Sequence, residues 1–114
     1  MADSIFQKIM AGQIPCQKVY EDDLVFAFRD IKPQAPVHIL IIPREPIPTI
    51  DDLQEKHAPM MGHLLVTAAK IARAEGLAED GYRLVFNCKG HGGQEVYHLH
   101  LHLLGGRQMN WPPG

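Results

Sequence analysis

Three histidines alternate with leucines near the C-terminal end of the chain, where residues 98–104 read HLHLHLL. Successive side chains of a β-strand point to opposite faces of the sheet. An extended run would therefore place His98, His100 and His102 on one face and the leucines between them on the other. We expect a strand over Val96 to Leu104, with one face for a hydrophobic core and one for imidazole chemistry.

Three uses fit imidazoles in this arrangement. Strand neighbours two positions apart lie about 6.7 Å from each other, so two of the histidines could share one zinc ion. His98 and His102 are about 13 Å apart and could not bind the same ion, so a zinc site would need further ligands such as His38 or His91. A neutral imidazole is also a good nucleophile for phosphorus near pH 7. The plain alternative is a polar strand face without chemistry.

A glycine-rich segment, Gly90 to Gln94, directly precedes the histidine run. Glycines let backbone N–H groups approach an anion closely. Such a loop alone is a weak signal, but joined to the histidines it favours phosphate chemistry.

Composition narrows the class of protein. The chain has 114 residues, and we expect a single domain over 1–114. A formal net charge of −2 gives no basic surface for nucleic acid. No apolar run is long enough to span a membrane, and Met-Ala-Asp-Ser lacks the features of a signal peptide. Cys16 and Cys88 are isolated, so no disulfide framework or thiolate zinc site is indicated. We expect a cytoplasmic protein.

The other segments predict the elements that position the histidines. Asp3 or Ser4 could cap a short helix that ends at Gly12. Apolar runs predict strands over 18–20, 24–28, 37–42 and 82–88, with a proline-containing loop over 30–36. Residues 89–93 are expected to form a loop.

A longer helix is expected in the middle of the chain. Asp51 and Gln54 resemble a capping box, and Pro59 suits a first helical turn. Apolar residues then recur at helical spacing, and Gly76 ends the pattern. Together the elements predict an α+β fold, a five-stranded antiparallel meander with one long helix on its apolar face and a short N-terminal helix.

With the histidine run in view, the sequence resembles the histidine triad (HIT) family, and within it the Hint branch of purine nucleoside phosphoramidases. Segments similar to Hint proteins occur along nearly the whole chain. They are Ser4-Ile5-Phe6, Asp30-Ile31, Pro33-Gln34-Ala35-Pro36, His38, Ile42-Pro43, Asp80-Gly81-Tyr82-Arg83, Asn87, Gly92-Gly93-Gln94, Gly105-Gly106-Arg107-Gln108-Met109 and Trp111-Pro112-Pro113-Gly114.

The resemblance implies a reaction on AMP or GMP amides, that is, on purine nucleoside phosphoramidates. His100 would attack the α-phosphorus and expel the amine, and water would hydrolyse the nucleotidyl-histidine intermediate. His102 would contact the phosphate and help protonate the leaving nitrogen. His38 and His98 would orient the site. Neither a cofactor nor a metal is implied.

The resemblance also implies a nucleotide site, with purine nucleoside monophosphates as ligands. Asp30 would accept the ribose hydroxyls. Apolar and neighbouring positions would form the base pocket, namely Ile5, Phe6, Ile9, Phe28, Arg29, Ile31 and Leu40. The ribose and phosphate would lie among Asn87, Gly93, Gln94 and Val96. Leu101 is the last of the implied nucleotide-binding residues.

Two positions depart from eukaryotic Hint proteins and favour a bacterial member. Glu95 stands where those proteins have serine, and Arg29 replaces a histidine, which would alter the rim of the base pocket. A carboxylate repels phosphate, so we expect Glu95 to face the departing amine, above all a cationic one. The kinetics of Glu95→Ser on neutral and cationic phosphoramidates test this, since equal effects on both would remove the idea.

Hint proteins are homodimers whose two sheets join into one continuous ten-stranded sheet, and the sequence is compatible with such a dimer. Met60, Met61, Leu64 and Leu65 offer apolar surface, although Met60 and Leu64 could instead complete the monomer core. Trp111 would reach toward the partner's site. Two other functions compete with the enzyme: a purine-nucleotide-binding or interaction module with incidental hydrolysis, and a zinc-binding protein.

Overall fold

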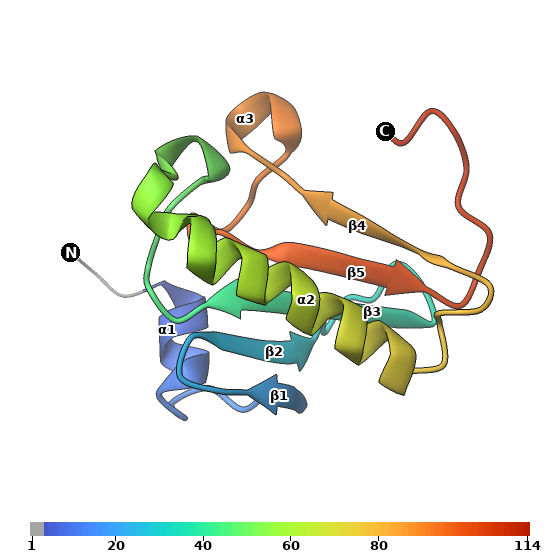
Figure 1. Ribbon diagram of the computed structural model, residues 1–114, viewed down its shortest axis with the longest axis horizontal. Helices are drawn as coiled ribbons and strands as arrows, with labels where there is room; N and C mark the ends of the chain where they lie inside the picture. Colours follow the sequence, from blue (N-terminus) through green and yellow to red (C-terminus); the bar gives the residue numbers. More distant parts are fainter. Residues whose placement is uncertain (1–3) are drawn as a thin grey trace.

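The computed structural model describes residues 4–114 and contains one five-stranded sheet (Figure 1). The strands are β1 (Lys18–Glu21), β2 (Val25–Arg29), β3 (Val37–Pro43), β4 (Tyr82–Phe86) and β5 (Leu101–Gly105). Their order across the sheet is β1-β2-β3-β5-β4, and every neighbouring pair is antiparallel. The antiparallel α+β fold is confirmed.

The predicted meander holds only for the first three strands. The last two are exchanged, because β5 lies between β3 and β4. The long helix α2 (Ala58–Ala74) connects β3 to the outer strand β4, and the chain then returns inward. Hydrophobic patterning marks each strand but does not encode which neighbour it joins, so this part of the prediction is wrong.

Two helices begin at residues that the sequence suggests, α1 (Ile5–Met10) with a side-chain cap and α2 with a proline in its first turn. In α1, Ser4 Oγ accepts a hydrogen bond from the Gln7 N–H, and the Gln7 side chain accepts one from the Ser4 N–H. The alternative cap, Asp3, lies outside the described residues. Pro59 occupies the first turn of α2, as predicted.

The capping box expected at Asp51 and Gln54 is wrong. Thr49 and Asp52 form it instead, at the start of a 3-10 turn over Ile50–Asp52. A second 3-10 turn, Glu55–His57, separates it from α2. The periodic apolar residues locate the helix correctly, but two short turns precede it.

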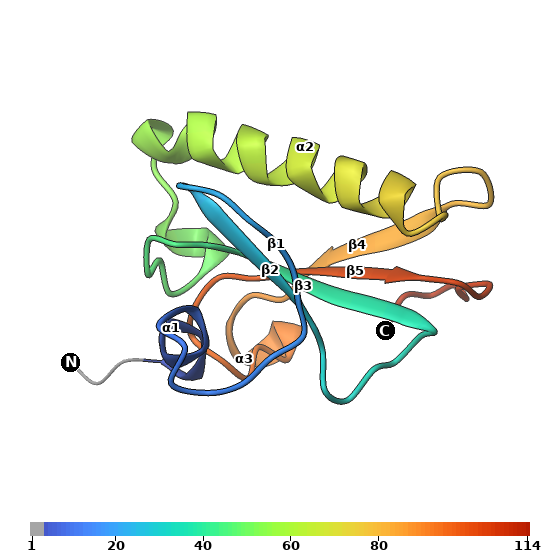
Figure 2. The same cartoon turned by 90° about the horizontal axis from the view of Figure 1, so that it is seen from below.

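The two faces of the sheet are covered differently (Figure 2). On one face α2 packs over a continuous aliphatic core, formed by Val25, Ala27, Ile39, Ile41, Leu64, Ala68, Ile71, Ala72, Leu77, Leu101 and Leu103. On the other face, called the cavity face below, lie α1 and the single helical turn α3 (Lys89–Gly92). Its smaller apolar cluster comprises Phe6, Phe26, Phe28, Leu40 and Ile42. The long helix therefore covers the apolar face, as predicted.

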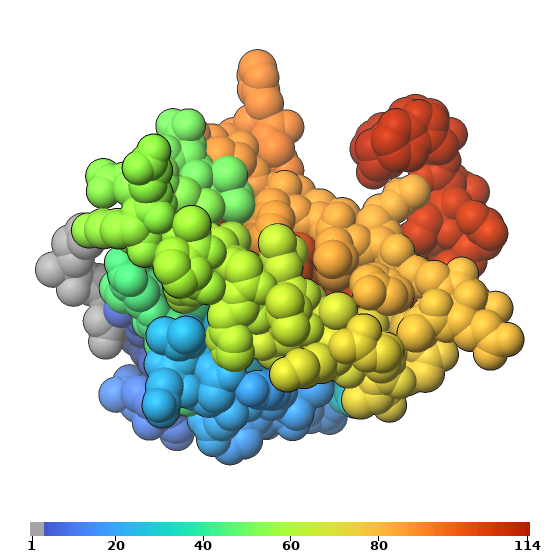
Figure 3. All heavy atoms as spheres, in the orientation of Figure 1, coloured from blue at the N-terminus to red at the C-terminus, as the bar shows by residue number. Residues whose placement is uncertain are grey.

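Two segments near the C-terminal end differ from expectation. Residues 89–92 form α3 rather than a loop. Beyond β5, the tail turns away from the sheet and stands off the body of the molecule (Figure 3), with Trp111 81% exposed. Within residues 4–114, no helix has the length and hydropathy that crossing a membrane requires.

Candidate active site

The histidine run is extended, but only its second half belongs to the sheet. Regular pairing begins at Leu101, whereas His98 and His100 precede β5. The Leu99 N–H donates to the Ile47 carbonyl, and His98 Nε2 donates to the Pro43 carbonyl, so this stretch bonds to residues at and beyond the end of β3. The alternation nevertheless persists, with Leu101 and Leu103 in the α2-side core and His100 and His102 bordering the cavity.

His100 is held in one tautomer by a backbone carbonyl. Its Nδ1 lies 2.7 Å from the His98 carbonyl oxygen, which can only accept, so Nδ1 carries the proton and Nε2 keeps its lone pair. The ring is 8% exposed and meets the edge of Phe6 at a centroid distance of 5.0 Å. Burial lowers the pKa of His100, which keeps the imidazole neutral near pH 7. This is the form of histidine that can act as a nucleophile.

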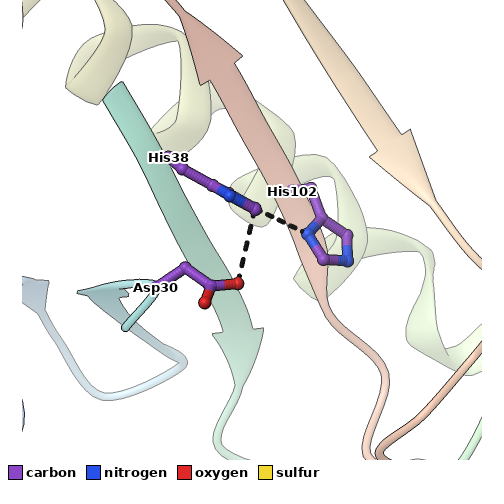
Figure 4. Close-up of side chains that lie close together, drawn as sticks. All are labelled: Asp30, His38 and His102. Carbon is purple, nitrogen blue, oxygen red and sulfur yellow. Dashed lines mark hydrogen bonds and ion pairs between the residues drawn. The ribbon is translucent and has the colours of Figure 1, made fainter. Parts of the chain in front are cut away.

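His38 and His102 form a hydrogen-bonded pair whose direction is set by the backbone (Figure 4). The Gln34 N–H donates to His38 Nδ1 at 3.0 Å, so the proton of His38 is on Nε2. His38 Nε2 then donates to His102 Nδ1 at 2.9 Å, which puts the His102 proton on Nε2.

His102 Nε2 is consequently an N–H donor without an acceptor. It is the one buried side-chain nitrogen or oxygen in residues 4–114 that has no hydrogen-bond partner. Burial, together with the neighbouring His100 and His38, lowers the pKa of His102 to about 4. An unsatisfied buried donor costs stability, so this N–H is available to a ligand that enters the neighbouring cavity.

Asp30 extends this network toward the loop that follows β2. One carboxylate oxygen lies 3.5 Å from His38 Nε2 (Figure 4), and the other accepts the Lys32 N–H at 2.8 Å. The side chain remains partly exposed. Its carboxylate can therefore face a ligand while it biases the orientation of His38.

His98 has a different environment from the other members of the run. It is 1% exposed, donates to the Pro43 carbonyl through Nε2, and lies 3.4 Å from Ser4 Oγ through Nδ1. It does not line the cavity. Its contacts tie the start of α1 to the histidine run, which suits an orienting role.

A cavity of about 500 Å³ opens on the cavity face, within the range of small-molecule sites. Apolar side chains of α1, β2 and β3 form one part of its wall, and the imidazoles and Asp30 form another. The predicted site residues among its lining are Ile5, Phe6, Ile9, Phe28, Arg29, Asp30, Ile31, His38, Leu40, Asn87, Gly93, Glu95, Val96, His100 and His102. Such a wall suits a flat apolar group joined to an anion.

Two predicted nucleotide contacts, Leu101 and Gln94, lie outside the cavity lining, and a third has its side chain bonded to another residue. Leu101 packs in the α2-side core, where the alternation of the strand places it. Gln94 is buried, accepts the Lys89 N–H and donates to the Pro48 carbonyl, so it fixes the α3 segment. Arg29 lines the cavity as predicted, although its guanidinium forms two hydrogen bonds to Glu75, at 2.9 and 3.1 Å.

Five lining residues were not predicted: Ile14, Pro15, Cys16, Lys32 and Gln34. The first three follow α1 in an irregular segment that carries no motif. Lys32 and Gln34 lie in the proline-containing loop. The resemblance of this loop to Hint proteins could have indicated that it lines the site. Glu95 is exposed at the cavity, and its proposed contact with the amine stays a prediction.

Asp30, His38 and His102 also raise the possibility of a metal site, because their ligand atoms lie within 4.8 Å of one another. A metal would need the lone pair of His38 Nε2. The Gln34 N–H already occupies the lone pair of His38 Nδ1, which places the proton on Nε2. Metal-bound histidines usually donate through the second nitrogen, whereas here it accepts. As arranged, these residues do not fit a zinc site.

Comparison with known proteins gives the family. Residues 11–109 match the family model described as HIT domain. The purine nucleoside phosphoramidase of Escherichia coli (strain K12) is 59% identical over 107 residues, which cover 94% of this chain and 90% of that protein. A Brassica juncea protein named 14 kDa zinc-binding protein is 54% identical over 114 residues, which cover 98% and 100%.

A solved structure agrees. The crystal structure of a HIT family hydrolase from Legionella pneumophila Philadelphia 1 superimposes with a TM-score of 0.96 at 57% identity, covering 98% of this chain and 100% of that one. The chain belongs to the HIT domain family and is a hydrolase of that family. Within it, the chain is a homologue of the purine nucleoside phosphoramidases, which confirms the resemblance seen in the sequence.

Proposed function

We propose that the protein hydrolyses the P–N bond of purine nucleoside 5'-phosphoramidates through a covalent intermediate on His100. The observation that carries the proposal is the pairing of two ring nitrogens beside one cavity. His100 Nε2 offers a lone pair, and His102 Nε2 offers an unpartnered N–H. The two ring centroids are 4.9 Å apart, so both can reach one phosphoryl group. The name of the E. coli relative supports this substrate class.

The reaction divides into two displacements. In the first, His100 Nε2 bonds to phosphorus and the P–N bond breaks with its electron pair on nitrogen. That nitrogen takes a proton passed on by His102, which takes up one proton from solvent and so remains a neutral imidazole. In the second, water bonds to phosphorus and the bond to His100 breaks, returning its electron pair to Nε2. The water keeps one proton in the new P–OH group and releases the other to solvent. Throughout, the His98 carbonyl accepts from His100 Nδ1 and stabilises the positive charge on the ring.

The test is hydrolysis of adenosine 5'-phosphoramidate, with AMP and ammonia measured as products. For His100→Ala we expect kcat/KM to fall by about 1,000-fold or more. His63→Ala is the matched control, because His63 binds Asp22 on the α2 side, away from the cavity. Folded wild-type protein that does not release AMP, or a His100→Ala variant as active as the control, would contradict the proposal.

The same assay addresses the competing functions. A nucleotide-binding module with incidental hydrolysis would bind AMP equally well with and without His100 but turn over substrate at a negligible rate. A zinc-dependent protein would lose activity in the presence of a chelator. We expect no effect of the chelator, because the donor arrangement around His38 does not fit zinc.

We further infer that two copies pair through β4 to form a continuous ten-stranded sheet. β4 is an edge strand, and Leu84 on it and Leu65 and Val66 on α2 are all at least 39% exposed. Leu64 is fully buried, and Met60 and Met61 pack against the core, so these three complete the monomer. Exposed edges and apolar patches of this kind favour association.

Trp111 is proposed to lie near the partner's site, because the tail that carries it projects from the body (Figure 3). Sedimentation of Leu84→Glu tests the pairing. A monomeric variant beside a dimeric wild type is expected, and a wild type that sediments as a monomer at micromolar concentration would contradict the inference.

A further inference from the structure

Arg107 lies two residues beyond β5 and binds the loop between β2 and β3. Its Nε and Nη2 donate to the Gln34 carbonyl oxygen at 3.1 and 2.9 Å. Gly106 lies against the same loop, since a Cβ added to it would come within 2.9 Å of Pro36, and its φ of +92° suits glycine. Gly106 and Arg107, called the tail clamp below, thus hold the loop to the end of β5.

The residue held by the tail clamp is the one that sets the tautomer of His38. The Gln34 carbonyl accepts from Arg107, while the Gln34 N–H donates to His38 Nδ1 at 3.0 Å. Fixing the carbonyl of a residue restricts its backbone dihedrals, and with them the direction of its N–H. Hydrogen bonds therefore run from Arg107 through Gln34 and His38 to His102.

The direction of the Gln34 N–H matters because a neutral imidazole can carry its proton on either nitrogen. If His38 moved its proton to Nδ1, its Nε2 would present a lone pair to His102 Nδ1. His102 would then need its own proton on Nδ1 to keep the 2.9 Å hydrogen bond. Nε2 of His102, whose ring lines the cavity, would change from a donor to an acceptor.

We propose that Arg107 is a positioning residue, which holds Gln34 so that His38 and His102 stay in the tautomers that present an N–H to the substrate. Arg107 itself does not line the cavity. The guanidinium suits this task, because two charge-assisted hydrogen bonds that converge on one carbonyl oxygen define a direction that lysine cannot reproduce. The expected effect of Arg107 on turnover rests on the proposed function. Its expected effect on the histidine tautomers does not.

The first test is nitrogen-15 NMR of the histidine side chains, which distinguishes protonated from unprotonated ring nitrogens without any substrate. In the wild type we expect His38 with Nδ1 unprotonated and Nε2 protonated. In Arg107→Gln we expect a mixture of tautomers at His38 and His102. Arg44→Gln is the matched control, because Arg44 Nε also donates to a backbone carbonyl, that of Asp22 in the β1–β2 turn. The control should match the wild type.

The second test is a kinetic cycle with His38→Ala on adenosine 5'-phosphoramidate. We expect Arg107→Gln to lower kcat by about tenfold, with KM changed much less, and Arg107→Lys to give an intermediate value. In the His38→Ala background, Arg107→Gln should have no further effect on kcat. If Arg107 only stabilised the loop, Arg107→Gln would lower kcat by the same factor with and without His38.

Unchanged tautomers in Arg107→Gln, or effects that simply multiply in the double variant, would overturn the inference. Failure of the proposed function looks different. The substrate would then not be hydrolysed by any variant, while the NMR spectra would still report on Arg107. Thermal unfolding of each variant confirms that the compared proteins are folded.

Discussion

The two faces of the sheet are built from alternate residues of the same strands, yet they are organised differently. On the α2 side, Ile39, Ile41, Leu101 and Leu103 are completely buried in a close-packed aliphatic core. On the cavity face, the neighbouring histidines are also largely buried, but they border about 500 Å³ of open space. One face is filled and the other is kept open. Stability and reactivity are thus assigned to opposite sides of single strands.

The difference is also electrostatic. The buried α2-side core is a cluster of aliphatic side chains, whereas the cavity face keeps four imidazoles largely buried in their neutral form, each with a lowered pKa that desolvation causes. Every one of them is fixed by a backbone carbonyl, a backbone N–H or another ring. Packing orders the first face, and hydrogen-bond direction orders the second.

The largest expected effects come from two adjacent residues of β5. Because His102 supplies the N–H to the leaving nitrogen, His102→Ala should lower kcat/KM by about 100- to 10,000-fold. It should change the free energy of unfolding by about 1 kcal/mol or less. Leu103→Ala, in contrast, should cost about 3 kcal/mol of stability through the cavity that it leaves in the core. Its kcat per folded molecule should stay near the wild-type value.

Urea unfolding and steady-state kinetics on both variants check this pair. If His102→Ala destabilised the protein as much as Leu103→Ala, or if Leu103→Ala abolished turnover while folded, the two faces would not be separable.

A pH series gives the next effect in size. The folded-state pKa values of the buried imidazoles lie below the ordinary value of 6.5, so the unfolded chain binds more protons as the pH falls below it. Stability is therefore fully present above pH 6.5 and declines on acidification. For His102, whose pKa is about 4, the loss by pH 4 approaches about 3 kcal/mol.

Urea unfolding at several pH values between 7.5 and 4 measures this dependence, and His102→Ala should show a smaller slope than the wild type. The acid limb of kcat/KM should have its midpoint below pH 6.5, because His100 must be neutral to attack and burial lowers its pKa. A midpoint above pH 6.5 would mean that the loss of kcat/KM in acid is not caused by protonation of His100.

The smallest effect is expected for the ion pair between Arg29 and Glu75. Glu75 follows α2 directly, whereas Arg29 is the last residue of β2 and lines the cavity. Because the pair is partly exposed, Glu75→Gln should reduce stability by about 1 kcal/mol or less and leave KM unchanged. Thermal unfolding and kinetics measure both. A markedly higher KM would place the Arg29 side chain at the nucleotide pocket after all.

The sequence predicts most local elements, because their signals are local. Ser4, one of the two predicted caps, begins α1, apolar periodicity locates α2, and alternation separates His102 from Leu103. Strand order is not a local property, which is why the placement of β5 inside the sheet was missed. Glycines at 90, 92 and 93 suggested a loop, yet residues 89–92 complete one helical turn before Gly93 adopts a positive φ.

The candidate site shows the same limit. At Leu101 the alternation pattern and the family resemblance disagree, and the structure follows the alternation. The resemblance placed the histidines and most of the cavity lining on one surface. It did not give the tautomers, since these depend on the directions of the His98 carbonyl and the Gln34 N–H, and residue types alone do not encode those directions.

The most direct test of the central claim is the stereochemical course at phosphorus. A purine nucleoside phosphoramidate made chiral at phosphorus is hydrolysed by the wild type in isotopically labelled water, and the configuration of the nucleotide product is determined. Attack by His100 followed by attack of water comprises two in-line displacements, so the account predicts overall retention of configuration. Overall inversion would show a single direct attack by water and would contradict it.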